Sequence, residues 1–548
     1  MLSAKERSKN IQQLQKQQYD LVIIGGGING AGVARDAASR GMSVALVEAN
    51  DFASGTSSRS SKLIHGGIRY LETFEFGLVF EALSERRKLF QIAPHLVHPL
   101  RFLIPLFKGD RVGMFKMGLG MWLYDALALF EAPEMHRRLN PEDVLNEFPT
   151  LKSEGLLGAY MYYDAYMDDD RLVHETLRSA ARMGAIAANY VKAEGALVDK
   201  NKNLIGIECV DQISGEIFQI HGRHIVSTVG PWTDDVAEHM LGEWKEIMRP
   251  SKGIHLTFSR QRFPLKEAVV MAADQQKRVI FGIPRHEMVI VGTTDTDFKN
   301  NPSLVKSDAE DVEYLLKITN QYFPGAHLKK SDIIASYSGV RPLVADNSAT
   351  ESGTSREHVI ISHPRNITFV AGGKYTTYRA MAEDTVRAAL SHFSIEDQVK
   401  FQKSRTLDPL NPKATGPLIE KALTTVEARK DKYSFSLPIQ KWLIERHGFE
   451  AFDLMAAATD VVGESEWARV WQIEARHAIR ETMCLTLRDF YLRRSPLFLA
   501  DKNHGFQFLN EIGQVFQEEL GLSSQDLEKQ INALRKHLEV EMGWSLTE

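Results

Sequence analysis

The sequence predicts an α/β protein, α+β overall, with a polar extension over residues 1–18, a sheet-containing region over residues 19–390 and a helical C-terminal domain over residues 391–548. Three observations predict this arrangement. Residues 19–47 read as strand, helix and strand, which is the pattern of a βαβ unit. Strand-like and helical stretches then alternate from residue 85 onward. After a polar, proline-containing link near residues 395–415, helix formers dominate.

The first element is the apolar run Tyr19–Ile24, followed directly by glycines, as in a buried parallel strand. A helix is expected from about Asn29 to Arg40, ending at Gly41, because glycine favours helix C-termini. Ser43–Val47 supplies the second strand. The crossover between the two parallel strands should be right-handed.

Later segments carry weaker signals. The expected strands are His224–Thr228, Met288–Val291 and Ile367–Val370, and the periodic helical segments are Glu466–Tyr491 and Ser524–Val540. Three consecutive acids, Asp168–Asp170, cannot easily converge on one metal ion. We interpret them as the start of a helix, where the dipole favours negative charge. No metal site is predicted.

Composition narrows the class of protein. The chain has 548 residues, 43% of them hydrophobic and 25% charged, and a net charge of −5. These values are typical of a large globular protein and do not suggest a nucleic-acid partner, which usually requires a basic domain or stripe. Only Cys209 and Cys484 occur, far apart and without metal-ligand spacing. A reducing compartment therefore fits better than a disulfide framework.

The N-terminal residues Met1–Tyr19 lack the apolar core of a signal peptide, so we expect a frayed extension of a cytoplasmic protein. No uncharged apolar stretch reaches the roughly 18 residues of a membrane-spanning helix. The nearest is Val112–Phe130, which Lys116 and Asp125 interrupt.

The glycine-rich stretch 25–30 matches G-x-G-x-x-G directly after the first strand. Gly25 allows the tight turn, Gly27 lets the backbone approach a pyrophosphate, and Gly30 allows close helix–strand packing. The pyrophosphate would sit at the helix start near Asn29. Glu48, at the end of the second strand, can accept hydrogen bonds from a ribose hydroxyl. The pattern predicts a dinucleotide but leaves FAD and NAD open.

Six further motifs occur in a fixed order. They are Thr56–Leu71 (TSSRSSKLIHGGIRYL), Gly230-Pro231-Trp232, Lys252-Gly253-Ile254-His255, Gly292–Asp295 (GTTD), Ser338–Pro342 (SGVRP) and Gly372–Arg379 (GGKYTTYR). Together they resemble the FAD-dependent, respiratory glycerol-3-phosphate dehydrogenases, from about residue 19 to 390 and more loosely beyond. The chain departs from the family at Ile254, where Ser is usual, and at residues 227–229, where Asn-Ala-Thr is usual.

The resemblance implies a Rossmann-like FAD-binding domain interleaved with a β-sheet substrate-capping domain. It also implies noncovalent FAD, glycerol 3-phosphate as substrate and dihydroxyacetone phosphate as product. By the same analogy the cofactor is contacted by Thr56, Ser57, Ser61, Lys62, Leu63, His65, Val191, Gly373, Lys374 and Thr376.

Cations are needed to hold the substrate's phosphate, and arginine suits the task because its planar fork binds phosphate oxygens in pairs. The candidates lie in or near glycine-rich motifs, and Tyr70 can add a hydrogen bond. They are Arg69, Arg341, Arg356 and Lys374. The alternative for any one of them is an ordinary surface charge.

The hydroxyl proton of the alcohol requires a base, and histidine is the default because its pKa lies near neutrality. We favour His65 over His255 as the proton acceptor. Either can instead position the hydroxyl while Arg341 lowers the pKa of the alcohol. Alternatively, His65 is an ordinary core residue without a catalytic role. Trp232 is interpreted as a packing residue beside the flavin.

The electron acceptor is the most open question. Phe115, Leu119, Trp122, Ala126, Leu129 and Phe130 fall roughly on one helical face, with Lys108, Arg111 and Lys116 at its start. This suits a helix lying in a membrane interface, although a buried core or dimer helix is the alternative. The resemblance favours a peripheral protein of the inner leaflet that reduces quinone, and a homodimer. The rivals are a peroxide-producing oxidase, a flavin-binding protein without turnover and an amine or amino-acid oxidase.

Overall fold

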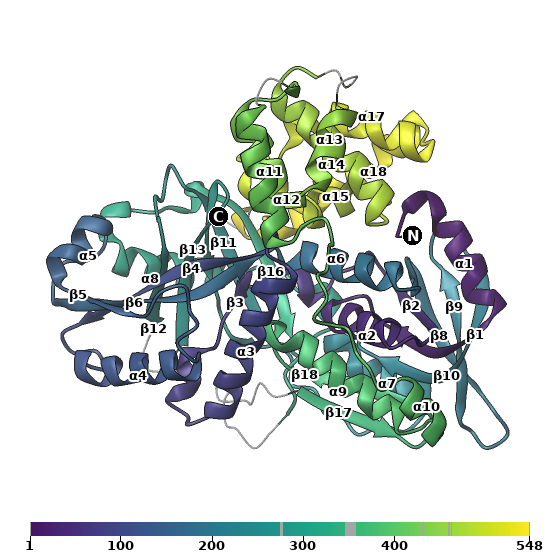
Figure 1. The fold of residues 1–548 in the computed structure, drawn as a ribbon. Coiled ribbons are helices and arrows are strands. Elements are labelled where there is room, and N and C mark those ends of the chain that lie inside the picture. The colour runs from purple at the N-terminus through teal and green to yellow at the C-terminus, as the bar shows by residue number, and fades with distance from the viewer. Residues whose placement is uncertain are drawn as a thin grey trace.

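The computed structural model describes residues 2–273, 278–345, 358–429, 432–458, 461 and 463–546. Two sheets lie side by side, and the C-terminal helices, green to yellow in Figure 1, gather above both of them. The predicted α/β class with a helical C-terminal domain is confirmed.

The first sheet has the strand order β17-β18-β10-β1-β2-β7, with β9 and β8 continuing from β10. The strands from β18 to β7 are parallel, as the βαβ pattern predicts. Their bounds are β1 Gln18–Ile24, β2 Val44–Glu48, β7 Ile186–Asn189, β8 Val191–Val198, β9 Leu204–Asp211, β10 Ile217–Ser227, β17 His358–His363 and β18 Ile367–Gly372.

Alternation along β1 explains how this sheet is covered. Leu21 and Ile23 pack into a core with helices α2 (Ile28–Ser39), α6 (Asp169–Arg182) and α9 (Tyr378–Leu390). Val22 and Ile24 point to the opposite face, where they pack against β8–β10 and α7 (Thr233–Leu241). Since successive strand residues face opposite ways, a strand buried on both faces is apolar throughout.

The second sheet has the order β15-β11-β14-β13-β12-β4-β6-β3, with β16 beside β11 and β5 beside β6. Its strands are β3 Leu63–Ile64, β4 Val97–Phe107, β5 Arg137–Leu139, β6 Leu156–Met167, β11 Ser251–Ser259, β12 Ala268–Ala273, β13 Arg278–Arg285, β14 Met288–Gly292, β15 Thr296–Asp297 and β16 Ile333–Arg341. Helices α3 (Phe76–Ile92), α4 (Met114–Leu127), α5 (Pro141–Glu147) and α8 (Ala309–Tyr322) accompany it. Strand β11 pairs with β16 so that Gly253 faces Gly339 and His255 faces Tyr337.

The C-terminal helices form two apolar clusters of their own. They are α11 Gly416–Ala428, α12 Leu437–His447, α13 Glu450–Ala457, α14 Glu466–Glu481, α15 Leu487–Arg493, α16 Leu497–Ala500, α17 Leu509–Leu520 and α18 Ser524–Glu541, after the short α10 Ile395–Lys400. The segment expected as one helix, Glu466–Tyr491, is two, because Thr486 and Asp489 form a capping box that starts α15 anew.

The polar N-terminus is not frayed. Residues Arg7–Lys16 form helix α1, which buries Ile11 and Leu14 against the first sheet. Arg7 is buried too, and its guanidinium lies 2.7 Å from a carboxylate oxygen of Asp211. The expectation of a frayed extension was wrong because a partner distant in sequence neutralises this charge, which the local composition does not reveal.

Candidate functional site

A cavity of about 810 Å³ is lined by residues of both sheets. This volume is in the range of cofactor and ligand sites. Sequence-predicted residues on its wall are Gly25, Gly27, Asn29, Glu48, Thr56, Ser57, Ser61, Leu63, His65, Tyr70, Val191, His255, Arg341, Gly373, Lys374 and Thr376. Gly30, Lys62 and Arg69 are not on the wall, and Arg356 lies outside the described residues.

The glycine turn has the geometry that a dinucleotide requires. Gly25 has φ +105°, in the region that favours glycine. A Cβ on Gly30 would meet the carbonyl oxygen of Gly25 at 1.9 Å, so no larger residue fits there. Gly27 is the N-cap of α2, and the helix start faces the cavity. The turn therefore offers close backbone approach and a helix N-terminus to a pyrophosphate.

Glu48 braces this turn from the end of β2. Its two carboxylate oxygens accept hydrogen bonds from the backbone N–H groups of Gly26, at 2.7 Å, and Asn50, at 2.8 Å. Burial raises the pKa of Glu48, although these backbone hydrogen bonds oppose the shift. Glu48 therefore lies on the cavity wall as an acceptor fixed in position.

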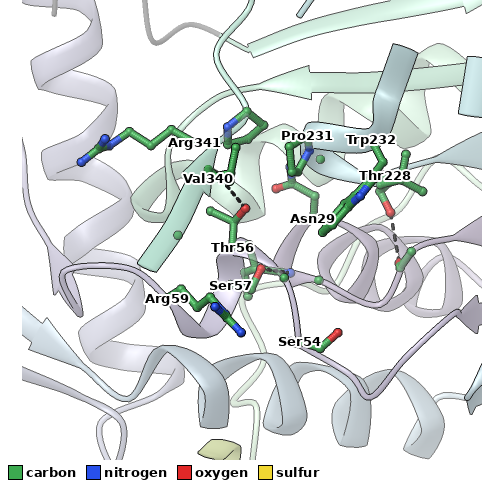
Figure 2. Close-up of a pocket in the computed structure, with 18 of the residues that line it drawn as sticks. Asn29, Ser54, Thr56, Ser57, Arg59, Thr228, Pro231, Trp232, Val340 and Arg341 are labelled. Carbon is green, nitrogen blue, oxygen red and sulfur yellow. Dashed lines mark hydrogen bonds between the residues drawn. The ribbon is translucent and has the colours of Figure 1, made fainter. Parts of the chain in front are cut away.

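The segment after β2 connects the two sheets. The Thr56 hydroxyl donates to the carbonyl oxygen of Val340 at 2.6 Å, and the Ser57 hydroxyl accepts from the N–H of Ile28 at 2.9 Å. Figure 2 shows both contacts, with Asn29 and Trp232 around the same space. Thr56 and Ser57 thus fix the wall of the cavity between β16 and helix α2.

At the departure from the family pattern, Thr228 supports the glycine turn. Its hydroxyl lies within hydrogen-bond distance of the carbonyl oxygens of Ile24, at 3.0 Å, and Gly25, at 3.1 Å. The second departure, Ile254, is fully buried in the core of the second sheet. Val229, where Thr is usual in the family, lines the cavity, so the first departure places an apolar side chain on the wall in place of a hydroxyl.

Lys62 has a different environment from its neighbours. Its side chain is buried and its ammonium pairs with the carboxylate of Asp169, the first residue of α6. Lys62 also has φ +55°, which is costly for a residue other than glycine, asparagine or aspartate. The other Asp169 oxygen accepts from the Ser60 hydroxyl at 2.7 Å. This pair holds the strained turn that presents Ser61 to the cavity.

His255 is buried on β11. Its Nε2 lies 2.8 Å from the Ser61 hydroxyl oxygen, and its ring stacks on Tyr337 with centroids 4.7 Å apart. Burial lowers the pKa of His255 well below 6.5, and the positive charges of Arg341 and Lys62 lower it further. His255 is therefore a neutral imidazole at pH 7.

His65 is half-buried on the cavity wall, at the end of β3. Its backbone N–H donates to the Thr376 hydroxyl at 3.2 Å, so two predicted segments far apart in sequence meet here. Its ring lies 6.3 Å from the ring of Phe281, between centroids. The structure thus places both candidate bases, His65 and His255, on one cavity.

Arg341 lies at the end of β16 on the same wall. Its guanidinium donates to the Thr293 hydroxyl and to the Thr294 carbonyl, both at 2.9 Å, and lies 3.1 Å from Asp295. A Cβ on Gly253 would meet the guanidinium at 2.5 Å, so glycine is required beneath it. Three of the sequence motifs therefore converge to orient one arginine.

Lys374 and Tyr70 face each other across the cavity wall. The ammonium of Lys374 lies 3.9 Å from the centre of the Tyr70 ring, a cation–π contact. Lys374 follows Gly372 and Gly373, whose φ values of +71° and +86° make the turn after β18. Lys374 and Tyr70 thus form one polar corner of the cavity.

Several wall residues were not predicted from sequence. Arg59 donates to the Ser338 carbonyl at 2.9 Å and pairs with Glu541 of α18. A Cβ on Gly55 would lie 3.1 Å from the Trp232 ring, so this ring packs against Gly55 on the cavity wall. The wall also includes Asn50, Ser54, Lys192, Pro231 and Leu343. Arg59 and Pro231 stand in sequence motifs, and no pattern signalled the others.

Comparison with known proteins gives matches over nearly the whole chain. The family described as FAD dependent oxidoreductase matches residues 20–384, and the C-terminal domain of alpha-glycerophosphate oxidase matches residues 420–527. An aerobic glycerol-3-phosphate dehydrogenase of Staphylococcus epidermidis is 34% identical over 98% of this chain and 97% of its own. One from Staphylococcus aureus is 33% identical over 96% and 95%.

Among solved structures, the chain is similar to a glycerol-3-phosphate dehydrogenase from Bacillus halodurans complexed with FAD. The TM-score is 0.81, with 28% identity and 99% of each chain covered. An L-alpha-glycerophosphate oxidase from Mycoplasma pneumoniae with FAD bound has a TM-score of 0.55 and 17% identity, covering 68% of this chain and 95% of that one. The second likeness shows a common fold.

Proposed function

We propose that this chain, which belongs to the FAD-dependent oxidoreductases and within them to the glycerol-3-phosphate dehydrogenases, oxidises sn-glycerol 3-phosphate to dihydroxyacetone phosphate and delivers the electrons to a membrane quinone. The observation that carries the proposal is the cavity wall. On it the glycine turn and Glu48 are joined by His65, His255, Arg341 and Lys374. A cofactor cradle, candidate bases and phosphate-binding cations are thus combined in one site.

The residues present fit noncovalent FAD. The turn of Gly25 and Gly27 with the start of α2 would hold the pyrophosphate, and Glu48 the ribose. Thr56, Ser57, Ser61 and the backbone near Val191 and Thr376 would hold the rest. When bound, FAD supplies the two-electron acceptor for the hydride that leaves C2 of the substrate.

The substrate's phosphate would bind Arg341 and Lys374, with Tyr70 as a further donor. Arg341 is already oriented by Thr293 and Asp295, so little side-chain freedom is lost on binding. His65 would take the hydroxyl proton. His255 would position the hydroxyl as a neutral imidazole, since its lowered pKa makes it a poor final proton acceptor.

The outer face of helix α4 supports a membrane location. Its exposed apolar side chains include Phe115, 81% exposed, and Trp122, 56% exposed. Leu119, Leu123, Leu129 and Phe130 extend the exposed surface, as do Phe74, Phe76 and Phe80 near the start of α3. Lys108, Arg111 and Lys116 are exposed beside it. A large apolar patch with basic flanks suits the surface of an anionic bilayer.

The inner face of α4 connects this patch to the cavity. The Tyr124 hydroxyl donates to Asp164 at 2.8 Å and accepts from the N–H of Gly66 at 3.0 Å, one residue after His65. Among the described residues, no helix is both long and apolar enough to span a bilayer. Because the outer face of α4 carries the exposed patch and its inner face contacts the segment beside His65, a quinone would approach from the membrane side of α4.

Replacing Trp122 with glutamate should reduce binding to anionic liposomes by about tenfold, because it places a charge in the exposed apolar patch that would enter the membrane interface. Flotation of the holoenzyme with phosphatidylglycerol vesicles measures this. The matched control is Trp467→Glu, which alters an exposed tryptophan of the helical domain. Equal flotation of both variants and the parent would remove α4 from the account. A change in oligomeric state without a change in flotation would make the patch a dimer interface.

The identity of the electron acceptor can be tested by supplying quinone and oxygen separately. With glycerol 3-phosphate, a soluble quinone under nitrogen should sustain turnover, and oxygen alone should give little hydrogen peroxide. Rapid peroxide formation in air with poor quinone reduction would contradict the quinone assignment and favour the oxidase.

A further inference from the structure

The loop after β2, residues 49–55, has two faces. One face lines the cavity through Ala49, Asn50, Ser54 and Gly55. Asp51 points the other way and is 1% exposed, although it lies only three residues after Glu48. Its carboxylate therefore needs partners inside the protein.

Asn189 of β7 donates a hydrogen bond to Asp51 Oδ1 at 3.0 Å, and the charged partners come from the C-terminal domain. Arg493 Nε lies 2.6 Å from Asp51 Oδ2, and Arg494 Nη2 lies 2.9 Å from Oδ1. Arg493 also binds Asp489 at 2.8 Å, which makes a buried quartet of two carboxylates and two guanidinium groups. Burial alone would raise the pKa of Asp51, but the two arginines lower it below its ordinary value. Asp51 thus stays charged and bound to the helical domain.

The quartet acts on the cofactor side of the loop through short contacts. Ala53 N–H donates to the carbonyl oxygen of Gly26 at 3.1 Å, and a Cβ on Gly26 would lie 2.6 Å from the Phe52 ring. Asn50 N–H donates to Glu48 at 2.8 Å. Both neighbours of Asp51 are therefore tied to the turn and to Glu48. A shift of Asp51 would move the groups that would hold the adenosine half of FAD.

We propose that the C-terminal helical domain completes the cofactor site, with Arg493 and Arg494 positioning loop 49–55 through Asp51 for FAD binding. The arginines act as positioning residues, since neither lines the cavity. Holding the loop in its bound shape lowers the ordering cost of binding. The helical domain therefore controls FAD affinity without touching substrate.

Arg494→Met tests this, with Arg178→Met as the matched control. Arg178 is equally buried and also joins the two parts of the chain, but through Glu450 and Glu481 of the helical domain rather than through loop 49–55. Apoprotein of each variant is titrated with FAD by flavin fluorescence, without substrate. We expect Arg494→Met to weaken FAD binding at least about tenfold. Arg178→Met should stay within about twofold even where it lowers the melting temperature.

Two further measurements separate positioning from general destabilisation. At saturating FAD, Arg494→Met should keep the parent's KM for glycerol 3-phosphate, and Arg494→Lys should recover part of the lost FAD affinity.

If Arg494→Met does not fold, Asp51→Asn and the double variant Asp51→Asn/Arg494→Gln replace it, and the double variant should bind FAD no worse than the single one. Parent-like FAD affinity in the folded variants, or equal losses in Arg178→Met, would overturn the proposal. Because affinity is measured without substrate, the result is independent of the acceptor.

Discussion

Replacing His65 with glutamine should lower kcat by about 10²- to 10⁴-fold, the range for loss of a general base, while FAD stays bound. Glutamine retains polarity and approximate size but cannot accept a proton at neutral pH. His65 is the half-buried histidine of the cavity wall, next to the segment that Tyr124 and Thr376 hold in place. Stopped-flow measurement of flavin reduction reports the step directly.

The matched variant is His255→Gln, for which we expect a smaller loss in kcat. A base must be unprotonated to act, so the rate falls on the acid side of its pKa. Burial, Arg341 and Lys62 hold the pKa of His255 well below 6.5, so His255 remains neutral throughout the range from pH 6.5 to 8. An acid limb in the pH profile of kcat that persists in His255→Gln and disappears in His65→Gln supports the assignment. The reverse pattern would make His255 the base.

Arg341→Ala should raise KM for glycerol 3-phosphate strongly and leave FAD bound. A charge-assisted hydrogen bond is worth about 1.5–3 kcal/mol, so kcat/KM should fall about 10- to 150-fold. The effect should appear mainly in KM, because the phosphate is bound in the ground state as well as in the transition state. Steady-state kinetics with saturating quinone measure both constants.

Arg341→Lys is the control for charge. It keeps the cation but lacks the fork that binds Thr293, Thr294 and Asp295, so we expect an intermediate KM. Loss of FAD from Arg341→Ala would contradict a substrate role. It would show that Arg341 mainly joins β16 to the segment 293–295.

Local patterns predicted the elements that have a simple period or a glycine signal. The strand Tyr19–Ile24 appears as β1 over Gln18–Ile24, and the helix expected from Asn29 begins at Ile28. Helix Ser524–Val540 appears as α18 over Ser524–Glu541. These elements could be predicted because burial of a strand or of one helix face imposes a regular apolar pattern on the sequence. Asp168 is the N-cap of α6, as its acidic cluster indicates.

Long-range pairings of charged groups could not be predicted in this way. Lys62 was expected at the cofactor, yet its ammonium is paired with Asp169, 107 residues away. No local sequence pattern marks Asp51, because its arginine partners lie 442 and 443 residues later. Such contacts depend on how whole domains pack, and a linear pattern does not record that packing.

The central claim is that glycerol 3-phosphate reduces the bound flavin of this protein. Purified holoenzyme mixed with sn-glycerol 3-phosphate under nitrogen should lose its flavin absorbance near 450 nm, whereas glycerol without the phosphate should leave it unchanged. Arg341→Ala should require a higher substrate concentration for the same bleaching. No bleaching by glycerol 3-phosphate in protein that holds a full complement of FAD would contradict the account.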